Sequence, residues 1–156
     1  MRTEQVPKCP PDRFLRPEDV LVCNIARGTL GRVCHVEPVG DKWTADTQVM
    51  IVRVGERCLG KSLFYYLYSR HGQRELLARE KGIAFADKRG QTHLYPRDTL
   101  TISVPLPAIV DQHRIVSYLD GARGRADELK RTQDSTATEL ARLEEAVIEM
   151  ALRGEI

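Results

Sequence analysis

Residues 108–152 read AIVDQHRIVSYLDGARGRADELKRTQDSTATELARLEEAVIEMAL, and this stretch decides the fold of the chain. Within it, eleven positions recur at alternating steps of four and three residues, and nine of the eleven are apolar. This heptad pattern is typical of a helix that packs an apolar stripe against another helix. The positions are Ile115, Leu119, Ala122, Ala126, Leu129, Gln133, Thr136, Leu140, Leu143, Val147 and Met150.

A helix over these positions is too long to be covered by the rest of the chain. About 36 residues at 1.5 Å each span about 54 Å, which exceeds the surface that so small a domain offers. We therefore predict that a partner helix covers the stripe, although a helix lying on its own domain is the alternative. Gly121 and Gly124, each costing about 1 kcal/mol relative to alanine, predict a break near Gly121. The predicted docking positions are Leu119, Ala126, Leu129, Leu140, Leu143 and Val147.

Upstream of the helix, the sequence predicts a small α+β domain. Four prolines within residues 1–17 indicate a loop segment. Apolar runs at 19–25, 32–36 and 49–54 predict strands, the first two joined as a hairpin by the turn at 27–31. Residues 61–80 have helical periodicity, which Gly72 is expected to kink or split, and a short strand is predicted at 100–104. Pro105 and Pro107 then place a domain boundary at 105/106.

Charge is distributed unevenly along the chain. Residues 1–105 hold 17 Lys+Arg against 12 Asp+Glu, whereas residues 106–156 hold 7 against 10. A basic domain followed by an acidic helix suits contact between the domain and phosphate, although the excess is modest. The four cysteines have no C-x-x-C spacing, and Cys23 and Cys34 lie in apolar runs, so no metal is predicted. Neither a signal peptide nor a membrane span is indicated, so a cytoplasmic protein is expected.

One local motif favours a different function. Residues 55–62, GERCLGKS, match the phosphate-binding pattern G-x-x-x-x-G-K-[ST], and Asp87 could stand behind a magnesium ion. A nucleotide-binding fold, however, needs several parallel strand–helix–strand units, and only about 42 residues separate Ser62 from the proline boundary. Glu56 would also face the phosphates. Nucleotide binding therefore stays an alternative, and we predict no cofactor and no catalytic residue.

Residues suited to DNA contact gather in a turn, a helix and a basic loop. Arginine and glutamine can read base edges, whereas lysine, threonine and backbone amides hold phosphate. A solvated loop has the same composition, so the residue types alone do not decide the function. The predicted DNA-binding residues are Arg27, Thr29, Arg70, Arg74, Lys88, Arg89, Gln91, Thr92 and His93.

Several segments in order resemble one protein family. These are ISVPLPAIVDQHRIVSYLD at 102–120, ELK at 128–130 and ALRGEI at 151–156, preceded by EDVLV at 18–22, TLGRV at 29–33, LFYYL at 63–67 and GQTHL at 90–94. Together they resemble the DNA specificity subunit of type I restriction-modification systems. Asp111-Gln112 departs from the Glu-Gln that is usual in the family.

The resemblance implies a target recognition domain followed by a spacer helix. In that family, two such domains are held apart by two antiparallel spacer helices, each domain reads half of a split DNA site, and methyltransferase subunits dock around the assembly. This chain has one domain and is short of the strands that open it in the family, so we interpret it as a half-subunit or fragment. Such a half is expected to pair with itself or with another specificity fragment, which for a symmetric pair implies a palindromic site.

The sequence therefore predicts three regions with one non-catalytic function. A proline-rich segment at 1–17 precedes a partial target recognition domain with a small mixed sheet at 18–105, and a helix that forms an antiparallel coiled coil follows at 106–156. The predicted function is DNA sequence recognition within a type I-like restriction-modification system. The partners are double-stranded DNA, a modification methyltransferase subunit and a second specificity chain, with no membrane. A helical assembly adaptor without DNA contact is a further alternative.

Overall fold

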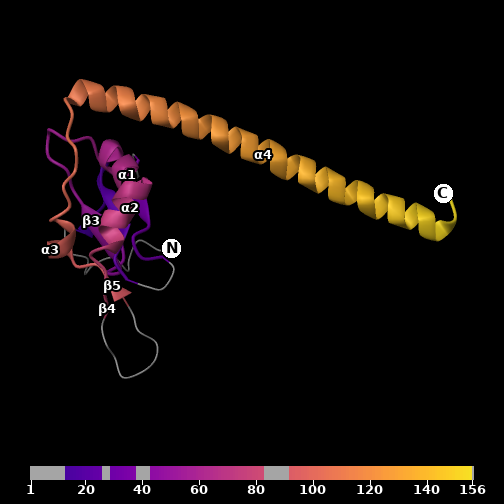
Figure 1. Cartoon of the computed structure of the whole chain (residues 1–156), viewed down its shortest axis with the longest axis horizontal. Helices are drawn as coiled ribbons and strands as arrows, with labels where there is room; N and C mark the ends of the chain where they lie inside the picture. The colour runs from indigo at the N-terminus through magenta and orange to yellow at the C-terminus, as the bar shows by residue number, and fades with distance from the viewer. Residues whose placement is uncertain (1–12, 26–28, 38–42, 83–91, 156) are drawn as a thin grey trace. The chain divides into compact units, whose positions relative to one another are not determined.

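The computed structural model describes residues 13–25, 29–37, 43–82 and 92–155, which fall into two compact units, 1–116 and 117–156. Strand β1 (Val20–Cys23) pairs antiparallel with both β2 (Val33–His35) and β3 (Val49–Val52), in the order β2-β1-β3. Figure 1 shows the whole chain and labels β3 of this sheet. The predicted hairpin and third strand are confirmed. Every strand pairing among the described residues is antiparallel, and this small sheet followed by a long helix confirms the α+β class.

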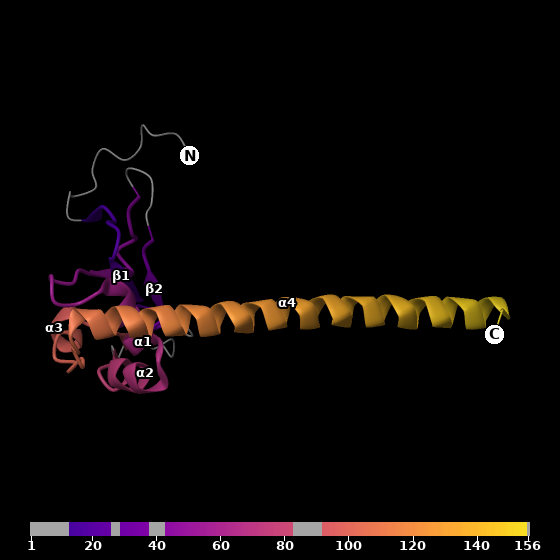
Figure 2. The same cartoon turned by 90° about the horizontal axis from the view of Figure 1, so that it is seen from above.

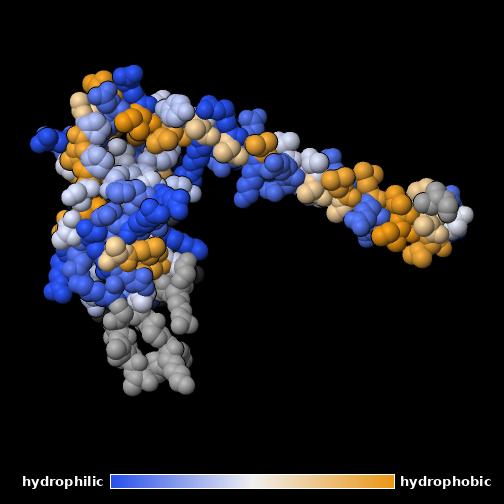
Figure 3. Space-filling model, viewed as in Figure 1, coloured by the Kyte–Doolittle hydropathy of each residue, from blue (hydrophilic) through white to orange (hydrophobic). Residues whose placement is uncertain are grey.

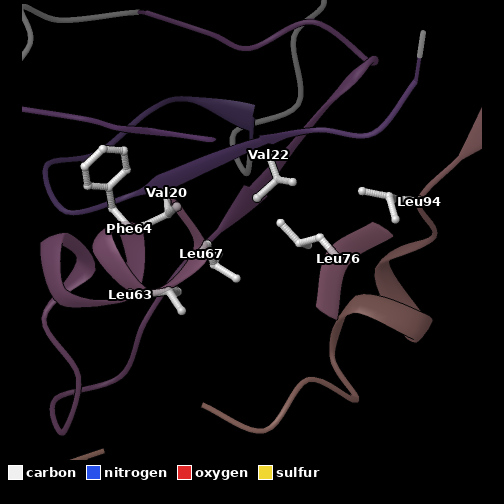
Figure 4. Close-up of a cluster of buried hydrophobic side chains, with 7 residues drawn as sticks. All are labelled: Val20, Val22, Leu63, Phe64, Leu67, Leu76 and Leu94. Carbon is white, nitrogen blue, oxygen red and sulfur yellow. The ribbon is translucent and has the colours of Figure 1, made fainter. Parts of the chain in front are cut away.

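The core of the first unit lies between β1 and helix α1 (Gly60–Tyr68). Val20 and Val22 alternate along β1 and are fully buried, because one face of the central strand is covered by the helix. Leu76 is fully buried as well, so a second helix contributes to the same core. Figure 4 shows the cluster, which consists of Val20, Val22, Leu63, Phe64, Leu67, Leu76 and Leu94.

The predicted helix at 61–80 is split, but at Ser69 rather than at Gly72. Ser69 has extended backbone angles, and its Oγ accepts a hydrogen bond from Gly72 N, so this serine begins α2 (Arg70–Leu77) as its N-cap. Gly72 has another role, because a Cβ there would lie 2.1 Å from Tyr66 O at the end of α1. The glycine therefore permits the close approach of the two helices, and the capping serine causes the break.

The strand predicted at 100–104 is wrong. Instead, α3 (Pro96–Thr99) ends just before this segment, and residues 102–108 have no regular structure. Side chains take the place of a strand partner, since Tyr66 Oη donates to Ser103 O at 3.0 Å and Arg79 Nη2 donates to Thr101 O at 3.3 Å. The two remaining strands, β4 (Lys81–Gly82) and β5 (Thr92–His93), form a separate antiparallel pair.

Helix α4 (Ile109–Arg153) is continuous over 45 residues, as Figure 2 shows. The predicted break near Gly121 is therefore wrong, because the helical hydrogen bonds run through both Gly121 and Gly124. Asp111 lies in the first turn and Arg153 in the last turn. Each charge is opposite in sign to the partial charge of the helix end beside it, which stabilises the helix. None of the described helices is long and apolar enough to cross a membrane.

Candidate nucleic-acid interface and partner-docking helix

A buried glutamine fixes the first turn of α4 within the first unit. Gln112 is 0% exposed, and its Oε1 accepts a hydrogen bond from Leu59 N at 2.9 Å. Its Nε2 donates to Arg57 O and to Pro107 O, both at 2.9 Å. One side chain thus satisfies a donor and an acceptor of the backbone just before α1, and an acceptor of the backbone just before α4. Because a buried amide with all these partners is costly to replace, Gln112 sets where α4 begins.

The phosphate-binding motif at 55–62 serves as a packing junction instead. A Cβ on Gly60 would lie 2.0 Å from Glu18 O, so the glycine is needed for backbone contact and not for wrapping phosphate. The amides at the start of α1 are already occupied, since Leu59 N donates to Gln112 and Lys61 N donates to Glu18 Oε2 at 3.3 Å. The preceding strand β3 is antiparallel, whereas nucleotide-binding folds use parallel strands. The structure therefore removes the basis for the nucleotide-binding alternative, and Asp87 lies outside the described residues.

Gly60→Ala is expected to lower the free energy of unfolding by about 3 kcal/mol, because the new methyl group must displace the backbone of Glu18. Gly55→Ala is the matched control, since a Cβ added at Gly55 would have nothing within 4 Å, and it should change stability by less than about 1 kcal/mol. Urea denaturation of both variants measures the difference. Equal small effects would show that Gly60 is not a close-contact position.

The structure places five of the nine predicted DNA-binding residues. Thr29 follows β1, Arg70 and Arg74 lie one turn apart on α2 with both side chains exposed, and Thr92 and His93 form β5. The other four, Arg27, Lys88, Arg89 and Gln91, lie outside the described residues. The exposure of the two α2 arginines leaves their guanidinium groups accessible to a phosphate backbone.

Contacts at the end of β1 bring the elements that carry these five residues together. Ile25 forms an antiparallel bridge with His93, so β5 lies beside the residues that directly follow β1. Gln73 Nε2 donates to Gly31 O at 3.0 Å, so α2 packs against the same turn. The turn at 29–31, α2 and β5 thus meet around the C-terminal end of β1, and we take the polar residues that these three elements carry as the candidate interface.

An aromatic side chain that the residue types did not single out extends this interface. Tyr95 is 36% exposed, and its ring stacks on His93 with centroids 6.0 Å apart. The guanidinium of Arg97 lies 5.9 Å from the centre of the same ring. Tyrosine beside arginine and histidine offers both a stacking surface and positive charge, which are features of nucleic-acid contact. The basic composition of residues 81–97 was the available signal, but the stacking depends on the fold.

Two other cationic side chains of this region form ion pairs within the first unit. Arg79 pairs with Glu75 Oε2 at 2.9 Å and also contacts Thr101, so it links α2 to the segment after α3. Lys81 Nζ lies 2.6 Å from Asp98 Oδ2, and this hydrogen bond lowers the pKa of Asp98 below its usual value. These contacts anchor the elements that present the candidate interface.

One cysteine thiol of the first unit has a raised pKa. Burial raises the pKa of the Cys58 thiol, with Glu18 adding to the effect, so this thiol is protonated at neutral pH. No group of three or more His, Cys, Asp or Glu side chains that could hold a metal ion occurs in the part of the chain that the structure describes.

In the second unit, the predicted docking stripe is exposed. Leu129, Leu140, Leu143 and Val147 are 53–62% exposed, Ala126 is exposed and Leu119 is half-buried. Figure 3 shows hydrophobic side chains along α4, gathered most densely toward its C-terminal end. Large apolar side chains repeated along one helix stripe are typical of a partner interface, because their exposure to water is unfavourable.

The chain is similar in fold to a protein of known structure. No family model matches the chain, and no curated protein matches it. Among solved structures, a chain described under "Structural basis underlying complex assembly and conformational transition of the type I R-M system" is 27% identical, with a TM-score of 0.67. The match covers 94% of this chain and 33% of that one, so this chain spans about a third of the length of its neighbour. The fold of this chain is thus related to that of a component of a type I restriction-modification complex.

Proposed function

We propose that the chain is a DNA sequence-recognition subunit of a type I-like restriction-modification system. In this role the first unit reads a half-site, and α4 docks to a methyltransferase partner and to a second specificity chain. The chain itself is non-catalytic and acts in the cytoplasm. The observation that carries the proposal is the order of parts in one chain, a small α+β unit and then a 45-residue helix with an exposed apolar stripe, matched over 94% of its length by a chain from such a system.

The proposed DNA surface combines described and undescribed residues. Arg70 and Arg74 on α2, with Thr29, Thr92 and His93 around the end of β1, supply phosphate and base-edge contacts. Arg27, Lys88, Arg89 and Gln91 are proposed to complete it, and the stacked pair His93 and Tyr95 adds an aromatic surface. Such a surface binds DNA of any sequence through charge and adds specificity through base contacts.

Replacing Arg70 and Arg74 together by alanine is expected to weaken DNA binding roughly tenfold and to make its salt dependence shallower by about two phosphate contacts. Mobility shift with random-sequence duplexes at several salt concentrations measures both quantities. The matched control replaces Arg131 and Arg142, two exposed arginines of α4, and should leave binding unchanged. An effect of equal size in the control would show that α2 is not part of the DNA-binding surface.

The same assay separates the proposed function from the adaptor alternative. A helical assembly adaptor without DNA contact would show no salt-dependent DNA binding by the unaltered chain. Replacing Lys88 and Arg89 by alanine tests the basic loop separately, because binding should weaken while the oligomeric state stays the same. Unchanged DNA binding in that variant would exclude the two residues from the interface.

A further inference from the structure

Strand β3 lies at one edge of the three-stranded sheet, because the strand order is β2-β1-β3. In an antiparallel pair, successive residues direct their N–H and C=O groups alternately toward the partner strand and away from it. Asn24 N, just after β1, donates to Gln48 O at 3.0 Å. Met50 and Val52 follow Gln48 at steps of two residues, so they form their backbone hydrogen bonds with β1. The N–H and C=O groups of Ile51 therefore point away from β1.

This outer edge of β3 is closed at its beginning and open further along. Val49 N donates to Asp46 O at 3.0 Å, and Arg13 Nη2 donates to Val49 O at 3.5 Å. In the part of the chain that the structure describes, by contrast, the backbone groups of Ile51 and Arg53 have no hydrogen-bond partner. Unpaired groups along a strand edge are a template for pairing with another strand.

An apolar cleft of about 310 Å³ lies along the open part of this edge. Ile51 and Arg53 are among its lining residues, so the cleft lies directly beside the unpaired backbone groups. Its volume is at the lower end of the range for binding pockets. The other lining residues come from β3, from α1 and from the segment after β5, and they include Met50, Val52, Leu63, Leu67, Ile102 and Val104.

The apolar core of the first unit is not fully covered at this cleft. Met50, Val52, Ile102 and Val104 pack against the core cluster but are only partly buried, and Leu100 beside them is 82% exposed. Apolar surface that faces water beside a core is unfavourable, and such a patch marks a binding surface. A chain segment that enters the cleft would cover these side chains.

We propose that the outer edge of β3 and this cleft bind an extended segment of a partner polypeptide, which adds a fourth strand to the sheet. The backbone of the segment bonds to Ile51 and Arg53, and its side chains at alternate positions enter the cleft. The inference goes beyond the proposed function, because the site contains none of the proposed DNA-binding residues and no part of the stripe of α4.

The open edge identifies the occupant as extended chain. Ile51 and Arg53 are two residues apart, and their free backbone groups therefore repeat at about 7 Å, which is the repeat of a β-strand. A helix uses its own N–H and C=O groups internally, so it would leave the groups of β3 unpaired while excluding water from them. An apolar small molecule would leave them unpaired for the same reason.

The cleft also specifies which side chains the segment carries. Arg53 is the charged residue of the lining, and its guanidinium is already bound, with Nε 3.2 Å from Asp19 Oδ1 and Nη2 donating to Phe14 O at 2.7 Å. A charged side chain entering the cleft would therefore be buried among apolar groups without a partner, which is costly. The segment is expected to be apolar at alternate positions, with polar residues between them.

Selection of short random peptides, displayed on phage, against the immobilised full chain tests this specificity. Enriched peptides are expected to share apolar residues at alternate positions, because only one face of the added strand meets the cleft. Enrichment of apolar residues at helical spacing would contradict an extended occupant. Failure to enrich any common pattern would contradict a peptide-binding site.

N-methylation of a selected peptide tests the strand pairing on the unaltered chain. Two versions, labelled with fluorescein, carry methyl groups on alternate amides in the two possible phases. The phase that methylates the N–H groups facing β3 should weaken binding about tenfold or more, whereas the other phase should leave it unchanged. Fluorescence anisotropy measures both affinities, and equal effects would show that the peptide does not pair with a strand edge.

Ile51→Pro closes the edge from the side of the chain. It removes an N–H group that faces away from β1, and proline is tolerated at such edge positions, so the circular dichroism should be unchanged. Binding of the selected peptide should weaken about tenfold or more. Val33→Pro is the matched control at the other edge of the sheet, because Arg32 O accepts from Cys23 N and the N–H of the next residue, Val33, faces outward.

The proline variants distinguish this site from the DNA surface. DNA binding by the Ile51 variant should be unchanged in the mobility assay, so loss of peptide binding and loss of DNA recognition are separate results. Peptide binding that survives Ile51→Pro, or that falls equally in the Val33 variant, would overturn the inference. Unfolding of the Ile51 variant would overturn it as well, since the N–H of Ile51 would then be needed within the sheet.

Discussion

Replacing Gln112 by leucine is expected to lower the free energy of unfolding of the first unit by about 3 kcal/mol. Leucine keeps the volume of the side chain but leaves Leu59 N without an acceptor and the carbonyls of Arg57 and Pro107 without a donor. A buried group deprived of its hydrogen bond costs about 1 to 3 kcal/mol, and three groups are affected. The effect should exceed that of any other polar substitution at the start of α4.

Hydrogen exchange of amides in the core measures this loss of stability. The amides of Val20 and Val22, in the central strand, report opening of the core, and their protection should fall with the stability of the unit. His113→Ala is the control, because the side chain of the adjacent His113 is exposed. If the Gln112 and His113 variants were equally stable, Gln112 would not be what fixes the start of α4.

Replacing both Leu129 and Leu140 by aspartate is expected to abolish pairing of α4, with an affinity loss of roughly a thousandfold or more. Both leucines belong to the exposed stripe, so a partner helix that covers it would bury the new carboxylates among apolar side chains. Each buried, unpaired carboxylate costs several kcal/mol, and 1.4 kcal/mol corresponds to a factor of ten. The variant should therefore be monomeric by light scattering while keeping its helical circular dichroism.

The matched control also introduces two aspartates into α4, but on the side of the helix opposite to the stripe. Arg131 and Thr138 lie outside the stripe and are exposed, so replacing both by aspartate should leave the mass of the assembly unchanged. If the leucine variant kept the mass of the unaltered chain, the stripe would have no part in association. Loss of mass in both variants would point to net charge instead of the apolar contact.

Local patterns predicted the elements whose stability depends on local periodicity. The heptad spacing from Ile115 to Met150 predicted α4 with nearly correct ends, and the apolar run at 19–25 predicted β1. The break predicted from Gly121 and Gly124 is absent from α4. The helical propensity of the residues around the two glycines outweighs a cost of about 1 kcal/mol each. Strong periodicity over many residues thus decides the structure against isolated unfavourable positions.

Features that depend on distant residues could not be predicted. The hydrogen bond from Leu59 N to Gln112 joins residues 53 apart, and no local pattern shows that this glutamine is buried. The segment at 100–104 has the composition of a strand, but the side chains of Tyr66 and Arg79 satisfy its carbonyls instead. Similarly, residues 55–62 match the phosphate-binding pattern, but Gly60 packs against the backbone of Glu18 and does not form a phosphate-binding loop.

The candidate DNA interface was predictable as residue types but not as an arrangement. Composition indicated Arg70, Arg74, Thr92 and His93, and the structure adds how α2 and β5 meet at the end of β1. The stacking of Tyr95 on His93 depends on the turn between β5 and α3, which the sequence did not define. Residue chemistry therefore suggests the function, and the packing of the elements determines which side chains can act together.

We propose that another helix covers the exposed stripe of α4. Sedimentation equilibrium of the unaltered full chain, over a wide range of concentrations, tests it most directly. We expect a mass of twice 17.7 kDa that falls to the monomer only on dilution. A mass of one chain at every concentration, with the helix intact, would contradict it.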